Sequence, residues 1–105
     1  MAYTSVEGTL PAGTPHTVFT CPHERGALIQ SIRVNNPGAY NFTVSKYTYN
    51  TSTLVQLYTV SLSAGDILTD INNISLRPGD YIQLTSDIAN TNYIVLINEY
   101  NYGGS

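Results

Sequence analysis

Residues 40–45 read YNFTVS and alternate strictly between apolar and polar side chains. Successive side chains on a β-strand point to opposite faces, so Tyr40, Phe42 and Val44 would share one side of an extended segment. This pattern is typical of a strand with one face in a core and the other in water. Apolar residues recur at a spacing of two along most of the chain, in runs bounded by Gly, Pro, Asn and Asp. The stretch therefore predicts an all-β fold.

Outward from this stretch, turn residues divide the chain into short predicted strands. Strands spaced about 8–12 residues apart indicate an antiparallel β-sandwich, jelly-roll-like or immunoglobulin-like, here with seven to eight strands. The seven clear strands are Ser5–Thr9, Thr14–Thr20, Ala27–Asn35, Tyr40–Tyr47, Leu54–Ser61, Tyr81–Ser86 and Tyr93–Tyr100. An eighth, broken strand is expected over Ile67–Leu76.

The segment from Ala27 to Asn35 changes phase, because Ile29 is followed by Ile32 and Val34. A β-bulge near residues 30–31 would return these three side chains to one face. With the same parity argument applied to the other strands, we predict the following core: Ile29, Ile32, Val34, Phe42, Val44, Tyr58, Ile82 and Leu84.

The length of 105 residues suits a single sandwich domain, residues 1–105, with a flexible tail at about 101–105. No apolar run approaches the ~20 residues that cross a bilayer, and the N-terminus lacks a secretory pattern, so we expect folding in a cytosol. Charged residues make up only 10% of the chain, and its four cations are scattered. This argues against nucleic-acid and membrane partners, and a weakly charged surface favours association.

Two turns share a pattern: LSAGD at residues 62–66 is echoed by LRPGD at 76–80. Glycine in each turn permits a positive φ. A calcium loop would need several carboxylates close together, which Asp66 and Asp70 do not supply. We therefore expect the aspartates of the two turns, Asp66 and Asp80, to bond turn amides, and we expect no cofactor.

His16, Cys21 and His23 are the nearest approach to a chemical motif. A Cys–His pair can form a nucleophile with its base, but no oxyanion donors are evident here. Three ligands of the right type are one short of a structural zinc site, unless a symmetric oligomer completes it. We expect the cysteine to be half-buried, with Cys21→Ser nearly unchanged in stability and assembly, and we expect no enzymatic activity.

Tyrosine is the dominant aromatic residue, with nine copies against two of Phe and none of Trp. Tyrosine faces can form a sugar-binding platform, so a carbohydrate-binding module is one alternative. The other interpretation is that these rings cap the core or line a subunit contact. The residues concerned are Tyr47, Tyr49, Tyr93, Tyr100 and Tyr102.

The chain resembles small virion proteins of tailed bacteriophages over residues 17–100. The resemblance is carried by VFTCP at 18–22, ALIQSIRVNN at 27–36, the Leu-x-x-Gly-Asp turns at 62–66 and 76–80, and a last strand at 92–100. It implies a β-sandwich in a virion, no catalysis and no catalytic residues. Such modules are capsid decoration (cement) proteins, neck or tail components, and fibre-associated domains. The short, stalk-free domain favours decoration, with the major capsid protein or other virion proteins as partners.

Two predicted strands are apolar on both faces, which a two-layer sandwich cannot cover. In the last strand, Val95 and Ile97 point opposite to Ile94 and Leu96. In the strand Leu54–Ser61, alternation puts Val55 and Leu57 opposite Leu54, Tyr58 and Val60. A loop of the same chain can cover the second faces, but we favour a neighbouring subunit in a homo-oligomer, a closed trimer, or the capsid or tail surface. The predicted interface residues are Val55, Leu57, Ile94, Leu96, Tyr100 and Tyr102.

Overall fold

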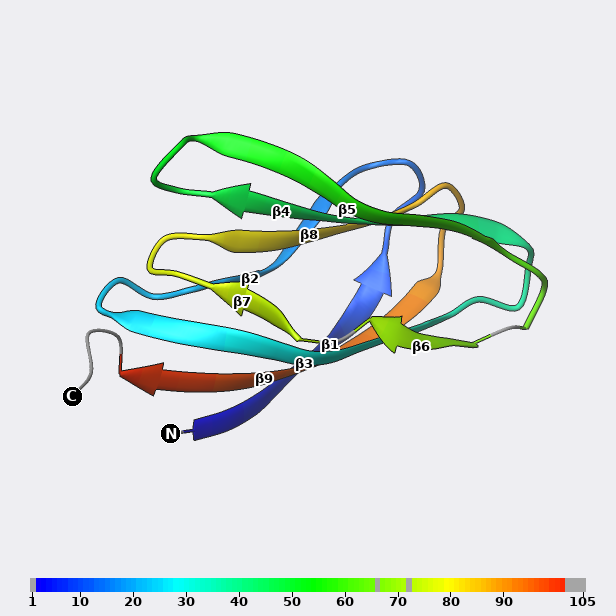
Figure 1. Ribbon diagram of the computed structural model, residues 1–105. Helices are drawn as coiled ribbons and strands as arrows, with labels where there is room; N and C mark the ends of the chain where they lie inside the picture. Colours follow the sequence, from blue (N-terminus) through cyan, green and yellow to red (C-terminus); the bar gives the residue numbers. More distant parts are fainter. Residues whose placement is uncertain (1, 66, 72, 102–105) are drawn as a thin grey trace.

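The computed structural model describes residues 2–65, 67–71 and 73–101, which form two antiparallel β-sheets packed face to face (Figure 1). Sheet A has the order β1-β9-β3-β6, with β7 also paired to β3, and sheet B has the order β2-β8-β4-β5. The strands are β1 (Ala2–Leu10), β2 (His16–Thr20), β3 (Arg25–Asn35), β4 (Tyr40–Thr48), β5 (Thr53–Leu62), β6 (Ile67–Ile71), β7 (Ile74–Leu76), β8 (Tyr81–Ser86) and β9 (Thr91–Asn101).

The strand pairs are nested like one long hairpin. β4 pairs with β5, β3 with β6 and then β7, β2 with β8, and β1 with β9, all antiparallel. Such a hairpin, rolled so that its strands divide between two packed sheets, is a jelly roll. The predicted antiparallel sandwich is confirmed, and of its two forms the topology is the jelly roll. The predicted broken strand Ile67–Leu76 is the pair of short strands β6 and β7.

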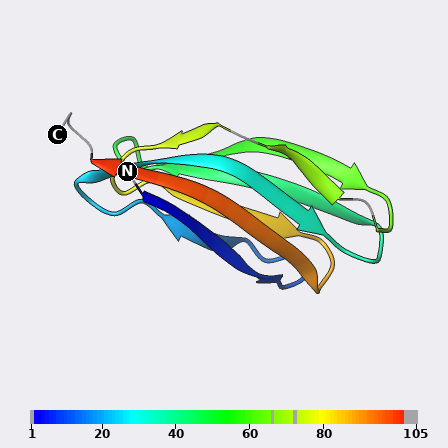
Figure 2. The same ribbon diagram turned by 90° about the horizontal axis from the view of Figure 1, so that it is seen from below.

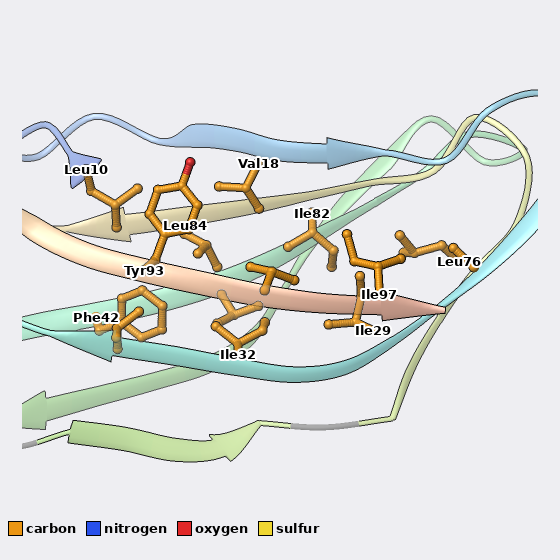
Figure 3. Close-up of a cluster of buried hydrophobic side chains, with 14 of the residues drawn as sticks. Leu10, Val18, Ile29, Ile32, Phe42, Leu76, Ile82, Leu84, Tyr93 and Ile97 are labelled. Atoms are coloured by element: carbon orange, nitrogen blue, oxygen red, sulfur yellow. The ribbon is translucent and has the colours of Figure 1, made fainter. Parts of the chain in front are cut away.

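The core lies between the sheets, and the rows of side chains that alternation predicted fill it (Figure 3). Phe42, Ile29, Ile32, Ile82 and Leu84 have no exposed surface. Seven of the eight predicted core residues are buried; the exception is the tyrosine of β5. Further buried side chains are Leu10, Val18, Cys21, Ala27, Tyr40, Leu76, Tyr93, Val95 and Ile97.

The predicted bulge in β3 is present. Ile29 pairs with Ile97 and Ser31 with Leu96, so Gln30 is an extra residue on β3. The insertion shifts the phase by one residue, and Ile29 and Ile32 both reach the inner face, where they are fully buried.

The prediction that Tyr58 is core is wrong, because 36% of it is exposed. Tyr58 pairs with Val44 and so faces inward, but β5 is an edge strand of sheet B (Figure 1). A second bulge lies here: Tyr58 is opposite Val44 and Gln56 is opposite Ser45, which leaves Leu57 without a partner on β4. The bulge also overturns the predicted alternation, because it puts Val55 on the same inner face as Tyr58.

Two glycines in sheet A are covered by tyrosines of β9. Gly8 is the cross-strand partner of Tyr93, and Gly26 is the partner of Tyr100. A Cβ at Gly26 would lie 2.5 Å from Cε2 of Tyr100, and one at Gly8 would lie 2.6 Å from the Tyr93 hydroxyl oxygen. The missing side chains therefore leave room for the outer end of each ring over the neighbouring strand.

No helix in the described residues is long and apolar enough to cross a membrane. Asn101 closes β9, whereas 102–105, the rest of the predicted tail, lie outside the described residues.

Candidate interaction surfaces

The outer face of sheet A carries exposed apolar side chains on its central strand. β9 runs between β1 and β3, as the view onto this sheet shows (Figure 2). Val95 and Ile97 are buried in the core, whereas Ile94 and Leu96 are each 38% exposed on the outer side. The predicted split of this strand into an inner and an outer apolar row is confirmed.

Charges flank the apolar row at one level of the sheet. Ile94 pairs with Glu7 of β1 on one side and with Arg33 of β3 on the other, so the three form one row across the strands. Glu7 and Arg33 are exposed, and neither takes part in an ion pair within the described part of the chain. At the next level Leu96 lies between two serines, Ser5 and Ser31.

Two shallow depressions, of about 280 and 220 Å³, open on this face. Both have Arg33 and Ile94 in their walls; Glu7 lines the larger one and Leu96 the smaller. Residues of β3 and β9 line both, so the hollows lie beside the ridge formed by Ile94 and Leu96, along the boundary between these two strands.

The outer face of sheet A continues towards the far end of β9. Asn98 pairs with Tyr3 and Leu28 there; it is 7% exposed, and its Oδ1 lacks a hydrogen-bond partner in the described chain. Tyr100, predicted as an interface residue, is half-buried against Gly26 on this same face. Tyr102, also predicted, lies outside the described residues.

The edge strand β5 is the second exposed apolar surface. Val55 and Leu57, both predicted interface residues, are each 45% exposed, with Leu54 and Tyr58 beside them. Residues 53–62 contain no charged residue and no proline, the usual protections of an edge strand. In the described structure β5 pairs only with β4, so its other edge presents free backbone groups.

Apart from the stacked rings of Tyr47 and Tyr81, the outer face of sheet B carries polar side chains that hydrogen-bond to one another. Thr43 bonds Thr59 across β4 and β5 at 3.2 Å, and Gln56 donates to the same Thr59 hydroxyl at 2.6 Å. Gln83 donates to the Thr17 hydroxyl at 3.3 Å, which ties β8 to β2. These side chains form rows of hydrogen bonds across the strands, which suits a face turned to water.

Cys21 is a core residue rather than the half-buried one expected. Its Sγ donates to the Arg25 carbonyl at 3.3 Å, and burial, with smaller contributions from Glu99 and Asp80, raises the pKa of its thiol to about 11. A protonated, buried thiol is a poor nucleophile. Because the side chain is buried, Cys21→Ser changes the core, and the expectation of unchanged stability no longer holds; the expectation for assembly stays.

The predicted histidine–cysteine cluster does not converge. His16 begins β2 and lies 6.2 Å from the Tyr93 ring, whereas His23 follows β2 and lies 5.5 Å from the Tyr49 ring, centroid to centroid. Among the described residues no three His, Cys, Asp or Glu side chains are close enough to hold a metal ion.

The turn at 76–80 is built as predicted. Asp80 is buried, and its carboxylate accepts hydrogen bonds from the backbone amides of Arg77 at 2.9 Å and Tyr49 at 2.8 Å. Lys46 Nζ lies 3.6 Å from the same carboxylate. The aspartate therefore joins two turns and pairs with the Lys46 ammonium. Asp66 of the first turn lies outside the described residues.

The tyrosines proposed for sugar binding are dispersed over the fold. Tyr47 stacks on Tyr81 at 4.6 Å on the outer face of sheet B, Tyr93 is buried between the sheets, and Tyr49 packs on the turn glycine Gly79. The four described members of the set form no common platform.

Known proteins share the fold of this chain, but none of the matches shows a family. No family model matches the chain, and no curated protein matches its sequence. The subunit of Bacillus endospore appendages, described as disulfide-linked pili, aligns with 14% identity and a TM-score of 0.59 over 95% of this chain and 85% of that chain. The Drosophila NLP core, described as a histone-binding pentamer, aligns with 10% identity and a TM-score of 0.60 over 96% and 100%. At these identities the chain shares a sandwich fold with both proteins.

Proposed function

We propose that the chain is a non-enzymatic structural subunit that assembles through the outer face of sheet A and the β5 edge. The observation that carries the proposal is the outward-facing pair Ile94 and Leu96 on the central strand of sheet A. Covering each of these side chains gains on the order of 1–2 kcal/mol. The buried, protonated Cys21 and the dispersed histidines support the absence of catalysis.

The assembly we propose is a virion, with the chain as a decoration protein on the head of a tailed bacteriophage. The sequence resemblance to small phage virion proteins supports this, as does the low charge of the surface. The β5 edge, uncharged and apolar, suits contact with the major capsid protein or with further copies in a closed trimer. The same fold occurs in subunits of an appendage and of a pentamer, so it is compatible with assembly. The neck or tail is the alternative location.

Co-sedimentation tests this function. The purified chain is mixed with tailless heads assembled from the major capsid protein of the same genome, and in parallel with isolated tails. The variants are Leu57→Asp on β5 and Leu96→Asp on sheet A, and Thr85→Asp on the outer face of sheet B is the matched control.

We expect the parent and Thr85→Asp to pellet with heads to saturation, and Leu57→Asp to lose at least tenfold in affinity. If the parent pellets with tails and not with heads, the protein is a tail component. If the parent binds neither, or if all three variants bind as the parent does, the proposal is wrong. Retention on immobilised glycans with no binding to particles would favour the carbohydrate-binding alternative.

A further inference from the structure

We infer that the outer face of sheet A is a two-fold contact with a second copy of this chain, held by reciprocal Glu7–Arg33 ion pairs on either side of Ile94. This inference deepens the assembly part of the proposed function, and it does not depend on the virion. It assigns one of the two apolar surfaces to the chain itself and leaves the β5 edge for other partners.

The first step is the order of side chains across the sheet. Neighbouring strands lie about 4.8 Å apart, so Glu7 and Arg33 stand about 10 Å apart with Ile94 midway between them. Both charges are exposed and unpaired in the described structure, unlike Arg25, which pairs with Glu99, and Lys46, which pairs with Asp80. Across β1, β9 and β3 the row therefore consists of a negative, an apolar and a positive side chain.

The second step is symmetry. A two-fold axis that lies in the contact plane along β9 reverses the order across the strands and keeps the position along them. Glu7 of one copy then faces Arg33 of the other, twice, and Ile94 and Leu96 face their own counterparts. Isologous contacts need such self-complementarity.

The third step excludes the other orientation. A two-fold axis across the strands at the level of Ile94 would place Glu7 on Glu7 and Arg33 on Arg33, and opposed like charges are costly. The charge pattern thus selects a pair with roughly parallel β9 strands. Sheets packed face to face cross at about 30°, which this axis allows if it lies about 15° from β9.

The apolar side chains and the hollows supply the fit. Ile94 and Leu96 form a ridge, and depressions of about 280 and 220 Å³ lie beside it, between β9 and β3. The two-fold axis along β9 brings the β1 side of the facing copy over these hollows, so its Glu7 can enter the hollow beside Arg33 while the two ridges meet each other. Three strands of nine residues span roughly 14 by 30 Å, or about 420 Å² per copy, which is below the size of standard stable interfaces, so the affinity should be modest and salt-dependent.

The test is sedimentation equilibrium of the isolated full chain over a concentration series. The variants are Glu7→Arg, Arg33→Glu and the double exchange of both. Glu24→Arg and Arg77→Glu, at exposed positions off this row, are controls with the same changes in net charge. Milder variants, Glu7→Gln and Arg33→Gln, guard against misfolding, and circular dichroism checks the fold of each.

The expected result is a parent that self-associates and loses affinity as salt rises. Each single exchange weakens association at least tenfold, each glutamine variant weakens it less, and the controls leave it unchanged. The double exchange restores association to within about threefold of the parent, because the pairs are re-formed with signs reversed. A parent that stays monomeric, or a double variant no better than the single ones, overturns the inference. Head binding by β5 can survive either outcome, so the two proposals fail separately.

Discussion

The two outer faces of the sandwich have the same geometry and opposite chemistry. The central strand β8 of sheet B presents Tyr81, Gln83 and Thr85 outward. Tyr81 stacks on Tyr47, and polar neighbours join in hydrogen-bonded rows such as Thr43–Thr59. The central strand β9 of sheet A presents Ile94 and Leu96. A jelly roll needs only its two inner faces to be apolar. The difference between the outer faces is therefore not required by folding, and it is a reason to propose the outer face of sheet A as a contact surface.

The largest expected effect is a difference in stability between variants at two neighbouring residues of β9, Ile97 and Leu96. Ile97→Ala removes a fully buried side chain and should lower the free energy of unfolding by about 2–5 kcal/mol. Leu96→Ala, one residue away on the outer side, should lower it by less than about 1 kcal/mol in the monomer but weaken assembly. Urea unfolding and light scattering measure the two quantities. Equal destabilisation by both would show that Leu96 is a core residue of the monomer.

An intermediate effect on stability is expected at Gly26, which the Tyr100 ring covers. Gly26→Ala puts a Cβ 2.5 Å from the Tyr100 ring, which must move, and overpacking of this kind costs about 1–3 kcal/mol. Because the ring is then displaced, adding Tyr100→Val should cost less in Gly26→Ala than in the parent. Thermal unfolding of the parent, the two single variants and the double variant gives a double-mutant cycle. If the two losses of stability simply added, the contact between Gly26 and the Tyr100 ring would be ruled out.

The smallest expected effect is on the pH dependence of stability in acid, and it concerns Asp87, which directly follows β8. The backbone amide of Asn41, and less strongly its side-chain amide, hydrogen-bond Asp87 and lower the pKa of that carboxyl below its usual 3.8. The contribution to stability is therefore present above pH 3.8 and is lost as the pH falls through the lowered value. Asp87→Asn should flatten the decline in stability below pH 4 and leave the assembled mass unchanged, whereas the exposed-loop control Glu24→Gln should leave the decline in place. A steeper decline in the Asp87 variant would contradict this.

Local patterns in the sequence predict the inside of this fold well. The alternation at 40–45, the phase change that required a bulge at Gln30 and the two-faced strand of Ile94 and Val95 all follow from the period of two. In each case the strand itself lies inside its sheet, between two neighbours, so parity alone decides which side chain is buried.

The edge of the sandwich could not be predicted in the same way. Tyr58 has inward parity but stays exposed, because burial at an edge strand depends on what the opposite sheet covers. No glycine or proline near Leu57 indicates a bulge there in the sequence. A signal for the covered glycines was present: Gly8 and Gly26 interrupt strands, and such positions often mark close contact with another group. The charged row of Glu7 and Arg33 depends on register between three strands that are far apart in the chain.

Methyl relaxation by a soluble gadolinium chelate tests most directly whether sheet A's outer face, and not sheet B's, is the contact surface. The methyl groups of Ile94 and Leu96 report on one face, and those of Thr43 and Thr85 report on the other. As the protein is concentrated from its monomeric range, relaxation of the Ile94 and Leu96 methyls should fall severalfold, while that of the threonine methyls stays constant. Relaxation that stays constant at all four residues over the full range, or falls only at the threonines, would contradict the account.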